Sequence, residues 1–143
     1  MEPLLKFRPV MLESTEGCMD ATFIRQPLLT PFFVLFEQWT GGAFTSNAVV
    51  PRSSFKVTKG TPSTYDAIGN SGKINKHFFC SKCGSGLYTE LEVMPDNTVI
   101  KAGTLDGGAA SLGGKVDVEF YVKDRPSYLA AVPGAKQEQA FGA

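Results

Sequence analysis

Short runs of β-branched and aromatic residues, separated by glycine and proline, make up most of the chain from residue 21 onward. In the segment 116–122, Asp117, Glu119 and Tyr121 alternate with apolar residues, which is the two-residue period of a strand with one buried face. The fifteen glycines and nine prolines disfavour long helices. These patterns predict strands over residues 21–25, 32–36, 44–50, 55–58, 63–66, 76–79, 86–90, 98–102 and 116–122.

Short strands at regular intervals predict an all-β fold, either a β-sandwich or a partly open barrel. The length of 143 residues fits a single domain, and we find neither an internal repeat nor a domain boundary. We expect residues 1–16 to form an N-terminal extension and residues 134–143 to form a flexible tail. The glycine-rich segment 106–114 is expected to be a loop, either a solvated connection or a lid over a site.

Charge and cysteine content narrow the class of protein. Fourteen basic and fourteen acidic residues give a formal net charge of zero, and no basic stripe is present, so nucleic acid and anionic membranes are not expected partners. The apolar run 28–36 is too short to span a bilayer. Three cysteines and the lack of a positively charged leader predict a cytoplasmic protein without a disulfide framework. Whether the chain forms a homo-oligomer stays open.

The most informative motif is Cys80-Ser81-Lys82-Cys83-Gly84, a Cys-x-x-Cys turn of the zinc-knuckle type, in which both thiolates can point at one metal ion. The glycine permits the tight backbone that follows. No thioredoxin-like βαβ pattern accompanies the motif, which disfavours a redox pair. The alternative to a metal site is a metal-free turn that holds two buried thiols.

Several further segments occur in a characteristic order. They are Trp39-Thr40-Gly41-Gly42-Ala43-Phe44, the strand and turn 49–55, Ser71-Gly72-Lys73 ahead of His77-Phe78-Phe79-Cys80, and Gly103-Thr104-Leu105-Asp106. In this order and spacing the chain resembles the glutathione-dependent formaldehyde-activating enzyme family, also called the centromere-protein-V family. The resemblance covers about residues 17–136 and implies a β-rich, Mss4-like fold.

The resemblance also implies a structural zinc site. The family builds this site from a Cys-x-Cys arm and a later Cys-x-x-Cys arm, and here Cys18-Met19-Asp20 falls where the first arm is expected. Zinc accepts a carboxylate oxygen as well as a thiolate. The implied ligands of one structural zinc are therefore Cys18, Asp20, Cys80 and Cys83.

The catalytic metal site of the family is not reproduced. Its three cysteines fall on Pro31, Phe33 and Phe36, none of which binds a metal. We therefore expect no catalytic zinc. The replacements would leave a pocket with an apolar, aromatic wall, which suits a small organic ligand.

Candidate catalytic groups come from positions near that pocket in the family. A carboxylate buried there would have a raised pKa, which is useful for proton transfer near neutral pH. His77 is the single histidine, and an unperturbed imidazole titrates near pH 6.5. We expect acid–base chemistry from Glu37, Glu119, Asp106 and His77, and we expect Phe33, Phe36, Trp39 and Tyr121 to shape the pocket. Each of these residues also has an ordinary structural interpretation, as a core or surface residue.

The leading hypothesis is a small-molecule enzyme that keeps the family fold and acts without a catalytic zinc. A lyase, dehydratase, isomerase or cyclase of specialised metabolism is expected, working through acid–base groups. One alternative is a non-catalytic module that binds a small molecule or a protein. A second alternative is a carbon–sulfur lyase acting on a glutathione adduct, which we rank last because its metal ligands are missing.

Overall fold

A computed structural model describes residues 39–69, 71–107 and 113–141 with their side chains, and the backbone of the strands at 5–6, 21–23 and 28–32. Five candidate site residues lie outside the residues described in this way: Cys18, Asp20, Phe33, Phe36 and Glu37. The strands are β1 (Leu5–Lys6), β2 (Ala21–Phe23), β3 (Leu28–Phe32), β4 (Thr45–Pro51), β5 (Phe55–Val57), β6 (Ser63–Ile68), β7 (Ile74–Phe79), β8 (Gly86–Leu91), β9 (Asn97–Lys101), β10 (Val118–Phe120) and β11 (Lys136–Glu138). Short 3₁₀ turns follow three of them, at η1 (Arg52–Ser54), η2 (Ala102–Thr104) and η4 (Val122–Asp124).

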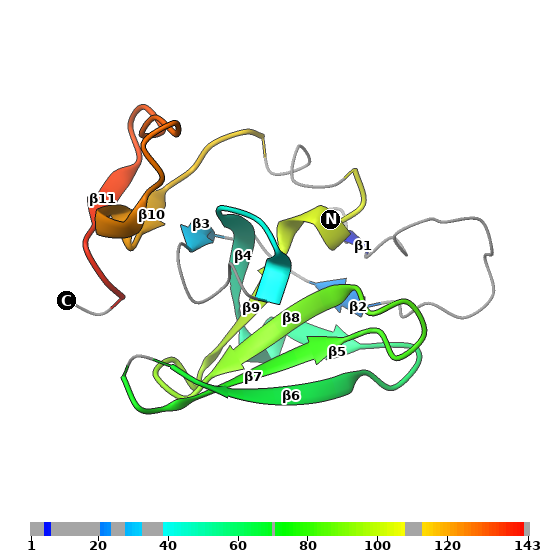
Figure 1. The fold of residues 1–143 in the computed structure, drawn as a ribbon. Helices are drawn as coiled ribbons and strands as arrows, with labels where there is room; N and C mark the ends of the chain where they lie inside the picture. Colours follow the sequence, from blue (N-terminus) through cyan, green and yellow to red (C-terminus); the bar gives the residue numbers. More distant parts are fainter. Residues whose placement is uncertain are drawn as a thin grey trace.

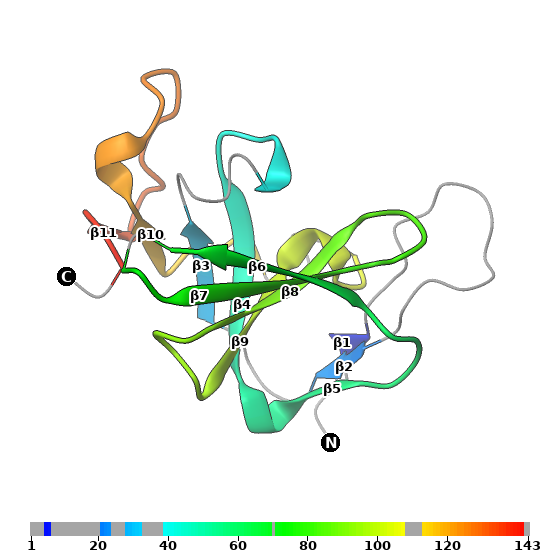
Figure 2. The same cartoon turned by 60° about the horizontal axis from the view of Figure 1, so that its bottom comes forward.

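The strands form two open sheets (Figures 1 and 2). The larger has the order β11-β10-β3-β4-β9-β8-β7-β6, and the smaller has the order β1-β2-β5. In the larger sheet, each neighbouring pair in the series β3-β4-β9-β8-β7-β6 is antiparallel, whereas β10 is parallel to both of its neighbours, β11 and β3. The all-β prediction is confirmed, and the described strands do not close into a barrel. Strand β11 lies in the segment that was expected to be a tail, and it pairs with β10.

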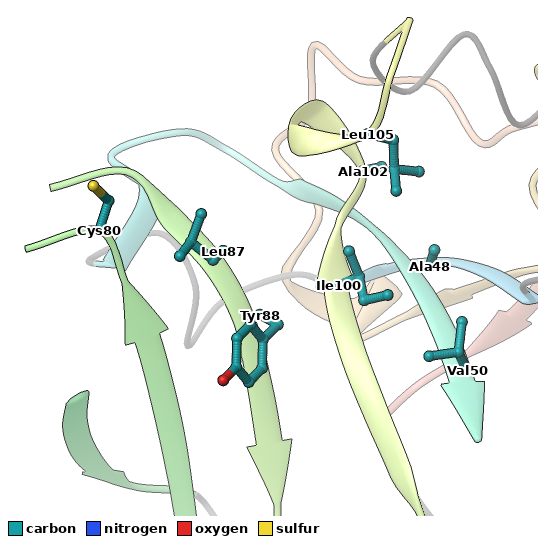
Figure 3. Close-up of a cluster of buried hydrophobic side chains, with 8 residues drawn as sticks. All are labelled: Ala48, Val50, Cys80, Leu87, Tyr88, Ile100, Ala102 and Leu105. Atoms are coloured by element: carbon teal, nitrogen blue, oxygen red, sulfur yellow. The ribbon is translucent and has the colours of Figure 1, made fainter. Parts of the chain in front are cut away.

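The two faces of the larger sheet carry different side chains. Register pairs Ala48 with Ile100, Ile100 with Tyr88, and Tyr88 with Phe78, so these residues lie in one row across β4, β9, β8 and β7. Their side chains belong to the main hydrophobic cluster, which we call the core face (Figure 3). Its buried members are Ala48, Val50, Cys80, Leu87, Tyr88, Ile100, Ala102 and Leu105.

Burial on the core face stabilises the sheet, since each fully buried aliphatic side chain contributes about 1.5–3 kcal/mol. Tyr88 lies among aromatic rings, with centroids 4.3 Å from Phe78 and 4.6 Å from Phe55. Burial raises the pKa of the Tyr88 phenol to about 12, and the nearby Glu90 carboxylate acts in the same direction.

The opposite face of the sheet is lined by the other alternate residues. Register places Val49, Val99, Thr89 and His77 in one row across the same four strands. Trp39 covers this row by stacking on His77, and we therefore call it the Trp39 face. A second hydrophobic cluster lies here, formed by Leu91, Val99, Trp39, Val49, Val93, Met94, Phe120, Tyr121 and Phe141.

A β-bulge changes which residues of β8 reach each face. Phe78 pairs with Tyr88, but Phe79 pairs with Gly86, so Leu87 is an extra residue in β8. As a result Leu87 and Tyr88 both join the core face. Gly86 takes the position on the Trp39 face.

Candidate functional site

A buried lysine stands at the centre of a polar cluster on the Trp39 face. Lys101 in β9 is the register partner of Asn47 in β4, and Thr45 lies two residues before Asn47 on the same side of the strand. The Lys101 Nζ donates to Asn47 Oδ1 at 3.2 Å and to Thr45 Oγ1 at 3.3 Å. Lys101 is only 8% exposed, and this burial lowers the pKa of its amine to about 7. Near neutral pH the amine therefore occurs in both its charged and its neutral form.

The backbone that follows Lys101 is held by its own hydrogen bond. The Thr104 hydroxyl donates to the Lys101 carbonyl oxygen at 2.7 Å, within the 3₁₀ turn η2. This contact fixes the end of β9, and with it the direction in which the lysine leaves the sheet.

His77 lies on the same face, in β7. The residue is 3% exposed, and its Nδ1 lies 3.0 Å from the Oγ1 of Thr89, its register partner in β8. Burial lowers the pKa of His77 to about 4, and the positive charge of Lys101 acts in the same direction. The imidazole is therefore neutral at pH 7, which differs from the titration near pH 6.5 expected for an unperturbed ring.

Trp39 forms an aromatic stack over this part of the sheet. Its ring lies nearly parallel to those of His77, at 4.5 Å, and Tyr65, at 6.1 Å, and it meets Phe79 edge-on at 5.7 Å. A methyl group built on Gly86 would lie 3.2 Å from the indole Nε1 and 4.0 Å from the Lys101 Cγ. The missing side chain at Gly86 therefore lets the indole pack directly on the strand next to the lysine stem.

Two of the predicted residues lie on β10 or just after it. Glu119 is 2% exposed, and its Oε2 accepts hydrogen bonds from Arg125 Nη2 at 3.0 Å, the Val132 N–H at 3.0 Å and Gln137 Nε2 at 2.6 Å. These contacts tie the segment after η4 to β10 and β11. Tyr121 packs in the same hydrophobic cluster as Trp39, and it has a left-handed backbone with φ of 57°.

Asp106 is half-buried in the turn that follows Leu105. The structure thus gathers His77, Trp39 and Tyr121 on the Trp39 face, whereas Glu119 is engaged in the network described above. The roles of Glu37, Phe33 and Phe36 stay predictions, because these residues lie outside the described part of the chain.

The Cys-x-x-Cys segment forms a tight turn between β7 and β8. The Gly84 N–H donates to the Cys80 carbonyl oxygen and the Cys80 N–H donates to the Ser85 carbonyl oxygen, both at 2.9 Å, and Gly84 has a positive φ of 75°. Cys80 is buried at the end of the core face (Figure 3). Cys83 is exposed, with its Sγ 3.2 Å from Ser85 Oγ.

The described residues contain no group of three or more His, Cys, Asp or Glu side chains that could hold a metal ion. The turn supplies two thiols, and the other two implied ligands, Cys18 and Asp20, lie outside those residues. The four-ligand site therefore stays a prediction. In the described part of the chain, no helix has the length and apolar character needed to cross a membrane.

Sequence reasoning missed Lys101, Thr45 and Asn47. The signal that could have revealed Lys101 is its place in the apolar strand Thr98-Val99-Ile100-Lys101-Ala102. Lys101 lies two residues after Val99, so an alternating strand places both side chains on one face. Thr45 and Asn47 follow the same period in β4, but only the strand order reveals that they meet the lysine.

The comparisons with known proteins agree with this fold. A model of the glutathione-dependent formaldehyde-activating enzyme family matches residues 37–124, which is more than half of the chain. The chain belongs to this family. A crystal structure of a Rhodobacter sphaeroides protein, from a structural genomics programme, shares the fold with a TM-score of 0.57 and 18% sequence identity. The match covers 78% of this chain and 96% of that one. The comparison with curated proteins gave no significant match.

Proposed function

We propose that this member of the family is a small-molecule enzyme that acts without a catalytic zinc. Its reaction would be a lyase, dehydration, isomerisation or cyclisation step of specialised metabolism, carried out in the cytoplasm. The observation that carries the proposal is the buried Lys101 amine, which burial holds at a pKa of about 7 and which Thr45 and Asn47 orient at 3.2–3.3 Å. A group that titrates near the working pH is suited to general acid–base catalysis.

Proton transfer by Lys101 accounts for all four reaction types. The neutral amine accepts a proton from a carbon next to a carbonyl group, and the resulting ammonium group returns it to a leaving hydroxyl or to another carbon. Asn47 Oδ1 and Thr45 Oγ1 accept hydrogen bonds from the amine and so favour one position for it. Lys101 is the acid–base group of this proposal, and the acid–base roles of Glu37, Glu119, Asp106 and His77 stay predictions.

His77 has a supporting role in this proposal. Because its pKa is lowered to about 4, the ring stays neutral and adds no second charge beside the ammonium group. Trp39 stacks on that ring, and its flat surface suits an aromatic or conjugated substrate.

The test is turnover of a panel of aromatic and polyketide-like β-hydroxy ketones, followed by mass spectrometry and by proton NMR in D₂O. Wild-type protein is expected to convert or deuterate a member of the panel. Lys101→Met should abolish this activity, whereas Lys56→Met, at an exposed position of β5, should retain it. Binding without turnover would overturn the proposal in favour of a binding module. Zinc-dependent activity on a glutathione adduct would overturn it in favour of a carbon–sulfur lyase.

We also propose one structural zinc between the Cys80–Cys83 turn and the Cys18–Asp20 segment. The support is the chemistry of the donors and the tight turn at Gly84, which carries both thiols within four residues of the chain. The test is metal analysis of purified protein by mass spectrometry. One zinc per chain is expected, and Cys83→Ser should reduce it strongly. Wild-type protein that contains no metal, and whose melting temperature does not change when zinc is added, would refute the site.

A further inference from the structure

Lys101 differs from the exposed lysines of the chain in two respects. Its side chain is buried against Gly86, and its Nζ donates hydrogen bonds to two side chains of the neighbouring strand. Neither of those two side chains is charged. A proton on this amine is therefore not stabilised by Thr45 or Asn47 as a carboxylate would stabilise it.

We propose that the Lys101 amine is a nucleophile that forms a Schiff base with an aldehyde or ketone, so that the substrates are carbonyl compounds. This inference rests on the proposed function, and it names the substrate class of the same site. An uncharged amine is the reactive form in such an addition, and desolvation is the usual means by which proteins maintain it. The lowered pKa of the amine agrees with this, since it makes the neutral form accessible near neutral pH.

The proposed step balances without any oxidant or reductant. The nitrogen lone pair attacks the carbonyl carbon, a C–N bond forms, and the oxygen takes up a proton to give a carbinolamine. The hydroxyl group then takes up one further proton from solvent and leaves as water, which gives the protonated imine. Thr45 Oγ1, 3.3 Å from the amine, is placed to carry the proton between nitrogen and oxygen, and the Asn47 side chain at 3.2 Å keeps the nitrogen in position.

The imine explains why one amine could support several reaction types. Its positive nitrogen withdraws electrons through the C=N bond and so makes the hydrogens on the carbon next to the imine carbon acidic. Removal of such a proton leads to dehydration, to a shift of a double bond or to ring closure, depending on the substrate. Hydrolysis with one water molecule then releases the product and restores the amine.

The inference is tested with pentane-2,4-dione, a small diketone that condenses with neutral amines to give a stable conjugated enaminone. Folded wild-type protein at pH 7.5 is treated with a limiting amount of the probe, digested and mapped by mass spectrometry. The expected result is an adduct at Lys101 in large excess over the exposed lysines. The same protein unfolded in urea is the matched control, and there the selectivity for Lys101 should be lost. Lys56→Met should label at Lys101 as the wild type does.

A second measurement separates nucleophilicity from simple exposure. Acetaldehyde with sodium cyanoborohydride should trap the imine as a secondary amine at Lys101, with a rate that rises about tenfold from pH 6 to pH 8 as the amine loses its proton. Lys101→Arg should give no adduct at this position. Labelling spread evenly over the exposed lysines of the folded protein, or none at Lys101, would overturn the inference.

The two proposals fail in different ways. Turnover that depends on Lys101 without any trapped adduct would leave proton transfer in place and would refute the Schiff base. An adduct at Lys101 in a protein that converts none of the panel would support the nucleophile and would refute the proposed enzyme.

Discussion

The buried amine makes a quantitative prediction about stability. In the folded protein Lys101 has a pKa of about 7, against 10.5 for an exposed lysine. Because the folded pKa is the lower one, the unfolded chain binds more protons between these two values, and the free energy of unfolding rises with pH across that window. Below pH 7 the amine is charged in both states, so the full cost of burying it, on the order of 5 kcal/mol, is present and constant.

Between pH 6 and pH 9, relief of this cost should raise the free energy of unfolding by about 2.7 kcal/mol. With an m-value of about 1.5 kcal/mol per M, the midpoint of urea unfolding should rise by about 1.8 M more in the wild type than in Lys101→Met. The change in unfolding free energy that comes from titration of His77 is present in both the wild type and Lys101→Met, so it cancels in this difference. Measurements stop at pH 9 because Tyr88 begins to influence stability at higher pH.

The assay is urea unfolding followed by circular dichroism at half-unit intervals of pH, with Lys56→Met as the control for removal of an exposed lysine. The control should follow the wild-type curve. Parallel curves for wild type and Lys101→Met would refute the lowered pKa, and the acid–base argument for this residue would lose its basis.

Three further predictions concern other parts of the structure. Trp39 is the only tryptophan and stacks on His77, so its fluorescence in folded protein should change with a midpoint near pH 4; a midpoint near 6.5 would contradict the burial of the ring. Glu119→Ala should destabilise the fold by about 3 kcal/mol because it removes the buried ion-pair partner of Arg125, and Glu119→Gln should destabilise it less. Urea unfolding measures both, and a loss of unfolding free energy below about 1 kcal/mol for Glu119→Ala would be inconsistent with the network. Thr98 Oγ1 is buried without a hydrogen-bond partner among the described residues, so Thr98→Val should stabilise the fold by about 1 kcal/mol. Thr89→Val should instead destabilise the fold, because it removes the hydrogen-bond partner of His77, and equal effects of the two variants on the melting temperature would contradict this.

The sequence predicted the central strands well because their two-residue alternation is strong and glycines or prolines separate them. The prediction for 116–122 was too long, since the structure ends β10 at Phe120 and Tyr121 turns the chain with a left-handed backbone. Residues other than glycine rarely adopt that conformation, so a pattern of alternating residues gives no warning of it. Strand β11 has only three residues, and its pairing with β10 is parallel and depends on contacts far apart in the chain.

The candidate site was harder to predict than the fold. Trp39, His77 and Tyr121 lie on one face of the sheet, and their roles in a site stay predictions. Lys101 was missed because a lysine is normally exposed, and only the order of strands β4, β9 and β8 shows that both of its sides are covered. The acid–base role of Glu119 stays a prediction, and its hydrogen-bond partners Arg125 and Gln137 lie in segments for which the sequence predicts no strand.

The extra residue in β8 connects two parts of the molecule that otherwise have separate roles. The Cys-x-x-Cys turn ends where the bulge begins, and the bulge determines that Gly86, rather than Leu87, lies beneath the indole of Trp39. Insertion or deletion of one residue between Ser81 and Ser85 is therefore expected to shift the register of β8 by one residue and to move its side chains to the opposite face of the sheet. It would place a leucine side chain where the Trp39 indole now packs beside Lys101, so the length of the turn affects how the indole and the lysine are arranged.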